Sequence, residues 1–254
     1  MNMDALNISI LGPGFLAGLL VLATHVPLGR QVLKRGIIFI DLAVAQMAGL
    51  GVVAASVLGW DTHGVAAQLA AVSAALIGSV LLTWTEKRCG DVQEAIIGGL
   101  FVLAASGGIL LLAYNEHGGE EFKDLLVGQI LWADLHTLGP AAIVSVVVLL
   151  IWFSIREKLG RGGFYVLFAI SVTVSVQLVG IYLVFASLIL PALATRKLGR
   201  RAGLTQAYAL GVLAYFSGLV LSALLDLPSG PVIVWTLAGL AVMLSFLHSK
   251  SASD

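Results

Sequence analysis

Charge, cysteine and enzyme motifs are all scarce in this sequence. Only 11% of the 254 residues are charged, against a hydrophobic fraction of 59%, and this balance excludes an ordinary soluble protein. Lys plus Arg (14) cancel Asp plus Glu (14), so no overall positive field is present to hold nucleic acid. The single cysteine, Cys89, cannot form an internal disulfide, and its basic neighbours indicate a reduced thiol in the cytoplasm. We therefore expect a protein of the lipid bilayer with no nucleic-acid partner.

Several motifs of catalytic chemistry are missing. No G-x-x-x-x-G-K-[ST] sequence occurs, so the chain cannot hold the phosphates of ATP, and any ATP energy must come from another subunit. The sequences H-E-x-x-H and G-x-S-x-G are also absent, which leaves no machinery for an intramembrane hydrolase. No Lys or Arg is expected inside a span, which argues against a proton-driven pump. These absences favour a membrane protein that is not an enzyme and binds no cofactor of its own.

Apolar runs of about 20 residues, the length of a helix that crosses the hydrocarbon core, are frequent. They predict an all-α bundle of about 8 or 9 crossings, formed as one membrane-embedded domain over residues 1–254. The start of the chain lacks the basic region of a signal peptide, so the first run is expected to be retained. The runs are 10–29, 36–59, 64–84, 95–114, 138–155, 162–195, 204–225 and 232–247.

Basic and acidic loops alternate along these runs. The loops that follow Arg30 and Lys87 are basic, whereas the loop over 116–124 is acidic apart from Lys123. Cytoplasmic loops carry an excess of Lys and Arg. We therefore expect a multi-pass protein of the bacterial cytoplasmic membrane, with its N-terminus outside and its C-terminus inside.

The charge-free run over 162–195 has basic residues at both ends, so it must enter the membrane and return. It is too short for two full crossings, which predicts one span plus a half-helix or short return near Pro191. A second short element is expected over 125–134. Broken elements survive in a bilayer only where protein or water covers their open backbone groups, so this region is a candidate gate or pathway wall.

Asp41 is the one acidic residue well inside an apolar run. A carboxylate there costs about 2.5 kcal/mol or more, so it must face protein or water rather than lipid. Small residues share its helical face, at Ala45, Ala48 and Gly49, followed by Val52, which suits a packed or solvent-lined interior.

His25 is expected at a depth similar to that of Asp41, because the two residues flank the same predicted hairpin. Imidazole and carboxylate form a ligand pair for zinc or manganese, but they could equally form a closed ion pair or a proton relay. Gln46 could join such a site only across a groove. A second buried polar cluster is expected at Gln177 with Thr173 and Ser175, where structural hydrogen bonding is the favoured role.

Two charged stretches lie outside the predicted spans. The first contains His117, Glu120 and Glu121, which could attract a cation, dock another protein or simply be solvated. The second contains Arg196, Lys197, Arg200 and Arg201, which could anchor at anionic headgroups or form a short interfacial helix that binds a cytoplasmic partner. The second stretch is expected on the inner face.

Three stretches resemble the permease subunits of zinc and manganese uptake ABC transporters. They are VLKRGIIFIDLAVAQ over 32–46, VGIYLVFASLILPALATR over 179–196 and DLPSGP over 226–231. In that family the first stretch contains D-A-L-S-H, whose Asp and His are assigned to the metal pathway. Asp41 matches the Asp, but the His falls on Ala45, and His25 is our candidate replacement.

This resemblance implies the cobalamin-importer-like (type II) ABC permease fold and transport of a divalent metal by alternating access. It implies as partners a second copy of the chain, two cytoplasmic ATP-binding subunits and an extracytoplasmic metal-binding protein. The coupling helix of the family maps onto 194–203. A permease for iron chelates or cobalamin, an ATP-independent secondary carrier and a non-transporting scaffold remain alternatives.

Overall fold

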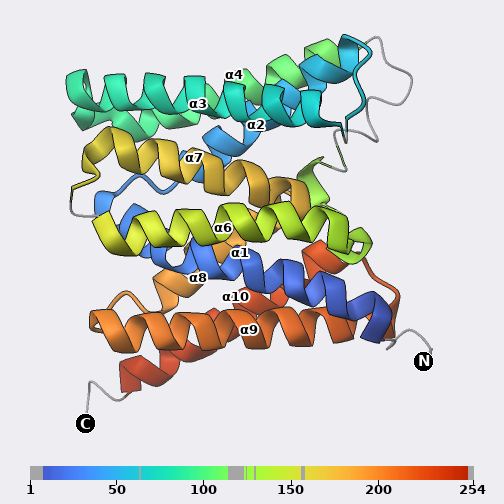
Figure 1. Cartoon of the computed structure of the whole chain (residues 1–254). Helices are drawn as coiled ribbons and strands as arrows, with labels where there is room; N and C mark the ends of the chain where they lie inside the picture. Colours follow the sequence, from blue (N-terminus) through green and yellow to red (C-terminus); the bar gives the residue numbers. More distant parts are fainter. Residues whose placement is uncertain are drawn as a thin grey trace.

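The computed structural model describes residues 8–62, 64–113, 123, 125–128, 130–155 and 158–250, which form helices joined by turns (Figure 1). The helices are α1 (Ile8–Arg35), α2 (Ile40–Val57), α3 (Val65–Arg88), α4 (Gln93–Leu112), α6 (Leu135–Ile155), α7 (Gly160–Val179), α8 (Ile181–Ala194), α9 (Arg200–Leu225) and α10 (Ser229–Lys250). The described residues also contain two 3-10 turns, η2 (Gly90–Val92) and η3 (Ile130–Trp132).

Within the described chain, 8 helices are long and apolar enough to cross a membrane, and α8 is a shorter apolar helix. This confirms the predicted number of crossings and the broken element over 162–195. Pro191 lies inside the short helix, but the break itself is at Gly180, between α7 and α8. Gly180 has a φ of 80°, a conformation that glycine adopts at no steric cost, so the chain can reverse there.

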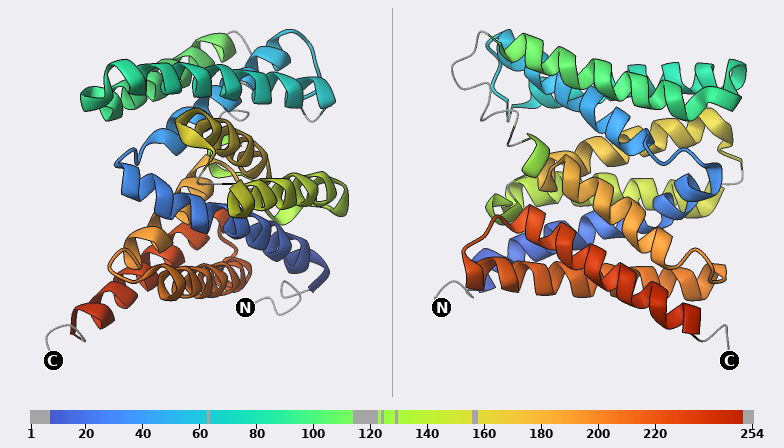
Figure 2. Two further views of the ribbon diagram at one scale, coloured as in Figure 1. Left: turned by 60° about the vertical axis from the view of Figure 1, so that its left-hand side comes forward. Right: turned by 180° about the vertical axis from the view of Figure 1, so that it is seen from behind.

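The helices stack in layers that run in a common direction. Figure 1 shows α3 and α4 at the top, α9 and α10 at the bottom, and α1, α6 and α7 between them, and Figure 2 shows the same order from two further sides. The most apolar stretches of α1, α2 and α7 are 56%, 61% and 67% buried, against 22% for α4 and α10. Helices α1, α2 and α7 therefore form the core, whereas α4 and α10 expose apolar side chains of the kind that contact lipid.

Basic residues gather at one end of the bundle. The turns after α1, α3, α6 and α8 all lie at the same end, on the left in Figure 1, while the start of α1 and the end of α10 lie at opposite ends. The basic residues beside these turns are Lys34, Arg35, Lys87, Arg88, Lys158, Arg161, Arg196 and Lys197. The alternation of charge along the sequence therefore corresponds to two ends of one bundle, and which end faces the cytoplasm stays a prediction.

A short segment at 127–128 fits between two glycines from distant parts of the chain. A Cβ atom on Gly128 would overlap the Val179 carbonyl, and a Cβ on Gly230 would lie 2.5 Å from the Val127 carbonyl oxygen. Gly180 is equally crowded by the backbone of Gly128. Two of the three stretches noted in the sequence, around Gly180 and Gly230, therefore meet at this segment, where only glycine permits backbone contact.

Candidate functional site

Asp41 is the second residue of α2, and its side chain is completely buried. Neither carboxyl oxygen accepts a hydrogen bond from any residue that the structure describes. The start of α2 is held by α4, because the Phe39 backbone N–H donates to Glu94 Oε1 at 3.1 Å. Ala45 and Ala48, on the same face as Asp41, are also buried. Asp41 therefore faces protein rather than lipid, as expected.

His25 lies within α1 and is also completely buried. Its Nδ1 atom lies 3.0 Å from Thr24 Oγ1 and 3.0 Å from the Val21 carbonyl oxygen, whereas Nε2 has no described partner. A proton on Nδ1, donated to the Val21 carbonyl, leaves the Nε2 lone pair free. That is the arrangement of a metal-ligating imidazole.

No hydrogen bond or ion pair joins His25 to Asp41, although both side chains are described. The closed ion pair considered from the sequence is therefore wrong for this conformation. Gln46 is buried on α2, with 4% of its surface exposed. Across the described residues, no group of three or more His, Cys, Asp or Glu side chains could hold a metal ion. These side chains thus offer separate contacts rather than a closed cage.

The remaining predicted polar residues have mixed outcomes. Thr173 and Ser175 are buried, and the Thr173 hydroxyl donates to the Ala169 carbonyl of its own helix at 2.8 Å. Gln177 is exposed, so the expectation of a buried cluster around it is wrong. Its neighbours Val176, Leu178 and Val179 are buried, so Gln177 lies on the side of α7 that faces away from the core. The predicted site residues His117, Glu120 and Glu121 lie outside the part of the chain that the structure describes.

The basic stretch after α8 does not form a helix of its own. Residues 195–198 form a turn, and Arg200 and Arg201 belong to the first turn of α9, so the expected short helix over 194–203 is wrong. Arg196, Lys197, Arg200 and Arg201 are all exposed. Cations at a helix N-terminus are disfavoured by about 0.3 to 1 kcal/mol, so Arg200 and Arg201 are not explained by the stability of α9.

Arg30 is a polar residue that the sequence analysis used only as a loop marker. Helix α1 continues to Arg35, so Arg30 lies inside this helix and not in a loop that follows it. Arg30 Nη1 donates to the Thr195 carbonyl oxygen at 3.1 Å and to Thr195 Oγ1 at 3.0 Å, and Nη2 donates to the Leu198 carbonyl oxygen at 3.1 Å. The helix-forming sequence after Gly29 was the available signal for this extension.

A proline in α1 makes a second contact possible, between α1 and α9. Pro27 has no N–H, so the carbonyl of Ala23 lacks the donor that a regular helix supplies. The Tyr208 hydroxyl of α9 donates to this Ala23 oxygen at 2.9 Å. Helix α1 is therefore bound to α9 on one side of His25 and to the α8–α9 turn on the other.

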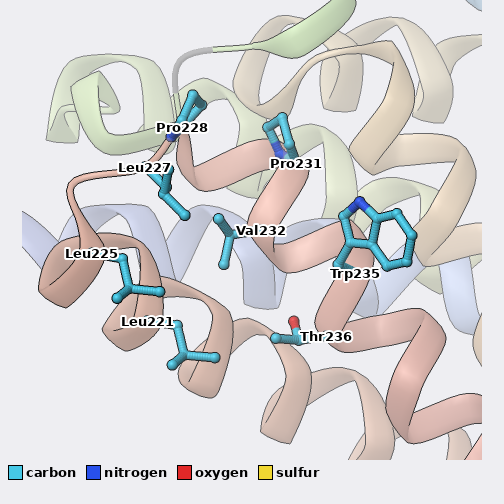
Figure 3. Close-up of a pocket in the computed structure, with 8 residues that line it drawn as sticks. All are labelled: Leu221, Leu225, Leu227, Pro228, Pro231, Val232, Trp235 and Thr236. Atoms are coloured by element: carbon cyan, nitrogen blue, oxygen red, sulfur yellow. The ribbon is translucent and has the colours of Figure 1, made fainter.

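Figure 3 shows an apolar groove between the end of α9 and the start of α10. Its lining is Leu221, Leu225, Leu227, Pro228, Pro231, Val232, Trp235 and Thr236. The Thr236 hydroxyl donates to the Ala214 and Ile233 carbonyls at 2.9 Å, and the Trp235 indole N–H is a donor that has no lone pair for a cation. The groove therefore offers no ligand for a cation, and the candidate site remains at Asp41 and His25.

Comparisons with known proteins agree with this description. The model of the ABC 3 transport family matches residues 7–162 and 154–248. A probable metal transport system membrane protein of Thermotoga maritima is 26% identical over 256 residues, covering 91% of this chain and 87% of its own. The high-affinity zinc uptake system membrane protein ZnuB of Haemophilus influenzae is 25% identical over 262 residues, covering 95% and 98%.

The fold is also similar to that of a solved structure. The structure of PsaBC from Streptococcus pneumoniae in complex with Fab matches with a TM-score of 0.74 and 19% identity, over 92% of this chain and 90% of that chain. This likeness confirms the expected type II permease fold. Since the family model covers nearly all of the chain, this multi-pass membrane protein belongs to the ABC 3 transport family.

Proposed function

We propose that this chain is the membrane permease subunit of an ABC importer that moves zinc or manganese across the bacterial inner membrane. The relatives above support the substrate class, because they are named as metal transport and zinc uptake membrane proteins. The observation that carries the proposal in this chain is Asp41, a fully buried carboxyl group with no described hydrogen-bond partner. A group of this kind is costly in a membrane protein unless it has a function.

The proposed mechanism is alternating access. Asp41, His25 and Gln46 make transient contacts with the ion, and the absence of a closed cage in the described chain suits a cargo that must leave. All three side chains are buried in this conformation, so the ion reaches them only when the surrounding helices move. ATP binding and hydrolysis in partner subunits supply that movement, and this chain performs no covalent chemistry.

The proposed assembly contains two copies of the chain, two ATP-binding subunits and an extracytoplasmic metal-binding protein. Arg196, Lys197, Arg200 and Arg201 form an exposed cationic surface that contacts the ATP-binding subunit. The unfavourable placement of Arg200 and Arg201 at a helix N-terminus supports a role in binding a partner. His117, Glu120 and Glu121 dock the binding protein or attract the cation.

The direct test is uptake of radiolabelled zinc or manganese by proteoliposomes that contain the chain and its ATP-binding partner, with the metal-binding protein supplied. We expect uptake that depends on ATP and is abolished by Asp41→Ala, with assembly unchanged. Asp91→Ala, which removes an exposed acid of η2, is the matched control and keeps normal uptake. Wild-type uptake by the Asp41→Ala complex would contradict the pathway role.

Two further outcomes separate the alternatives. Uptake of an iron chelate or cobalamin in place of the free metal would identify the related permease class. Uptake by the chain without any ATP-binding subunit would identify a secondary carrier, and the absence of any flux would indicate a scaffold. Reversing the charges of Arg200 and Arg201 to Glu is expected to weaken binding of the ATP-binding subunit, which co-purification measures.

A further inference from the structure

We infer that Arg30 is a positioning residue that joins α1 to the α8–α9 turn, so that movement of this turn is transmitted to the part of α1 that carries His25. The inference rests on the proposed function, in which the basic stretch around this turn contacts the ATP-binding subunit. The contact that would transmit the movement is the one between Arg30 and the residues Thr195 and Leu198.

The guanidinium group of Arg30 has its acceptors in the turn itself. It donates three hydrogen bonds of 3.0 to 3.1 Å, two to Thr195 and one to the Leu198 carbonyl. Thr195 is completely buried, and its hydroxyl donates to the Pro191 carbonyl at 2.8 Å, which aims an oxygen lone pair at Arg30. The last carbonyls of a helix lack helical donors and favour a cation. Arg30 therefore caps α8 from another helix.

Two glycines make this contact close. A Cβ on Gly203 of α9 would overlap the Arg30 guanidinium, so the absence of a side chain there creates the space that the group fills. A Cβ on Gly29 would overlap the Leu188 carbonyl oxygen, so the backbones of α1 and α8 are in direct contact one residue away. The planar fork of Arg30 is thus held between the turn and the first turns of α9.

His25 lies between the two places where α1 is bound. Tyr208 holds Ala23 on one side, and Arg30 holds the turn on the other. A short helical stretch fixed at both ends moves with the elements that bind it. By contrast, none of the hydrogen bonds of the described residues joins α2 to the α8–α9 turn. A displacement of the turn therefore moves His25 relative to Asp41, which changes their separation and the contacts available to an ion.

The test uses the complete complex in proteoliposomes and measures metal ions transported per ATP hydrolysed. Three variants weaken the contact in different ways. Arg30→Lys removes the guanidinium group with its several donors but keeps the positive charge. Thr195→Val removes the hydroxyl acceptor, and Gly203→Ala adds a Cβ that displaces the guanidinium group. We expect at least a tenfold lower ratio for Arg30→Lys and a smaller loss for the others, with ATP hydrolysis retained. Arg88→Lys, at an exposed arginine of the same end, is the control and keeps the wild-type ratio.

Each outcome decides the inference. Equal falls in transport and hydrolysis, an unchanged ratio, or loss of assembly in all three variants would overturn it, because a merely structural contact changes folding and not the ratio. Absence of metal transport by the wild-type complex would instead count against the proposed function. The two failures are therefore distinguishable.

Discussion

The Arg30 junction and the Asp41–His25 region treat buried polar groups in opposite ways. At the junction, each donor described above finds a carbonyl or hydroxyl oxygen, and even the carbonyl freed by Pro27 is paired with Tyr208. At Asp41 both oxygens lack a described partner, and at His25 one ring nitrogen does. Buried polar groups are almost always hydrogen-bonded, and exceptions require an explanation. The comparison separates the contacts that hold the fold from the groups left open for a passing ion.

The largest expected effect is an opposite change in stability from substitutions in the two regions. Arg30→Ala removes the Arg30 donor from the Leu198 carbonyl and from both Thr195 oxygens, of which only the Thr195 carbonyl keeps another donor, the Leu198 N–H. We expect the substitution to lower the free energy of unfolding by about 3 kcal/mol. Asp41→Leu removes an unpaired polar group and is expected to raise it by about 1 kcal/mol. Unfolding in mixed micelles measures both values, and a similar loss from both substitutions would break the comparison.

A smaller effect is expected where the backbones of α1 and α8 touch. Gly29→Ala forces α1 away from the Leu188 carbonyl, and overpacking of this kind costs about 1 to 3 kcal/mol. Gly99→Ala is the matched control, because a Cβ at this helical glycine meets open space and is expected to stabilise α4 by up to about 1 kcal/mol. Melting temperatures of the two variants in the same detergent should move in opposite directions. A neutral Gly29→Ala would show that the junction is loosely packed.

Removal of one hydroxyl tests the pairing around Pro27. Tyr208→Phe leaves the Ala23 carbonyl unpaired inside the protein, and we expect a loss of about 1 to 2 kcal/mol. Tyr182→Phe, at a side chain that is 50% exposed, serves as control and is expected to have little effect. Equal stability of the two variants in thermal unfolding would mean that water can replace Tyr208.

The smallest effect is expected at Asp134, an exposed carboxylate just before α6. Because this carboxylate accepts a hydrogen bond, it can be compared with the unpaired carboxylate of Asp41. Asp134 Oδ1 accepts the Thr137 backbone N–H at 2.8 Å, and hydrogen bonds from Thr137 lower the pKa of Asp134 below its usual value. A lowered pKa in the folded state stabilises the protein above the usual pKa of about 3.9, and this contribution is lost as the pH falls through the folded-state value. Stability curves of wild type and Asp134→Asn between about pH 5 and 2.5 should therefore converge on acidification. Parallel curves would show that this hydrogen bond contributes nothing.

Composition and charge spacing were sufficient for the membrane class, the number of crossings and the broken element over 162–195. These properties depend on local sequence, because a span must be apolar and its flanking loops carry the charges. Asp41 was identified for the same reason, as a single charge in an apolar run. Its burial confirms that it avoids lipid.

The contacts between distant segments could not be predicted in this way. Arg30 and Thr195 are 165 positions apart, and no periodicity relates a donor on one helix to an acceptor beyond another. The break at Gly180 was placed too close to Pro191, because proline is a visible breaker whereas the need for a positive φ emerges only from packing. Gln177 was expected to be buried for a related reason, since the face of α7 that turns away from the core is set by the helices packed around it.

The short length of α8 has an electrical consequence. Its 14 residues extend about 21 Å, whereas the hydrocarbon layer of a bilayer is about 30 Å thick. The start of α8 at Gly180 is contacted by the backbone of Gly128 rather than by another turn of helix. Separation of these two backbone segments would let water reach the start of α8, and the low-dielectric path that a doubly charged ion must cross there would be shorter.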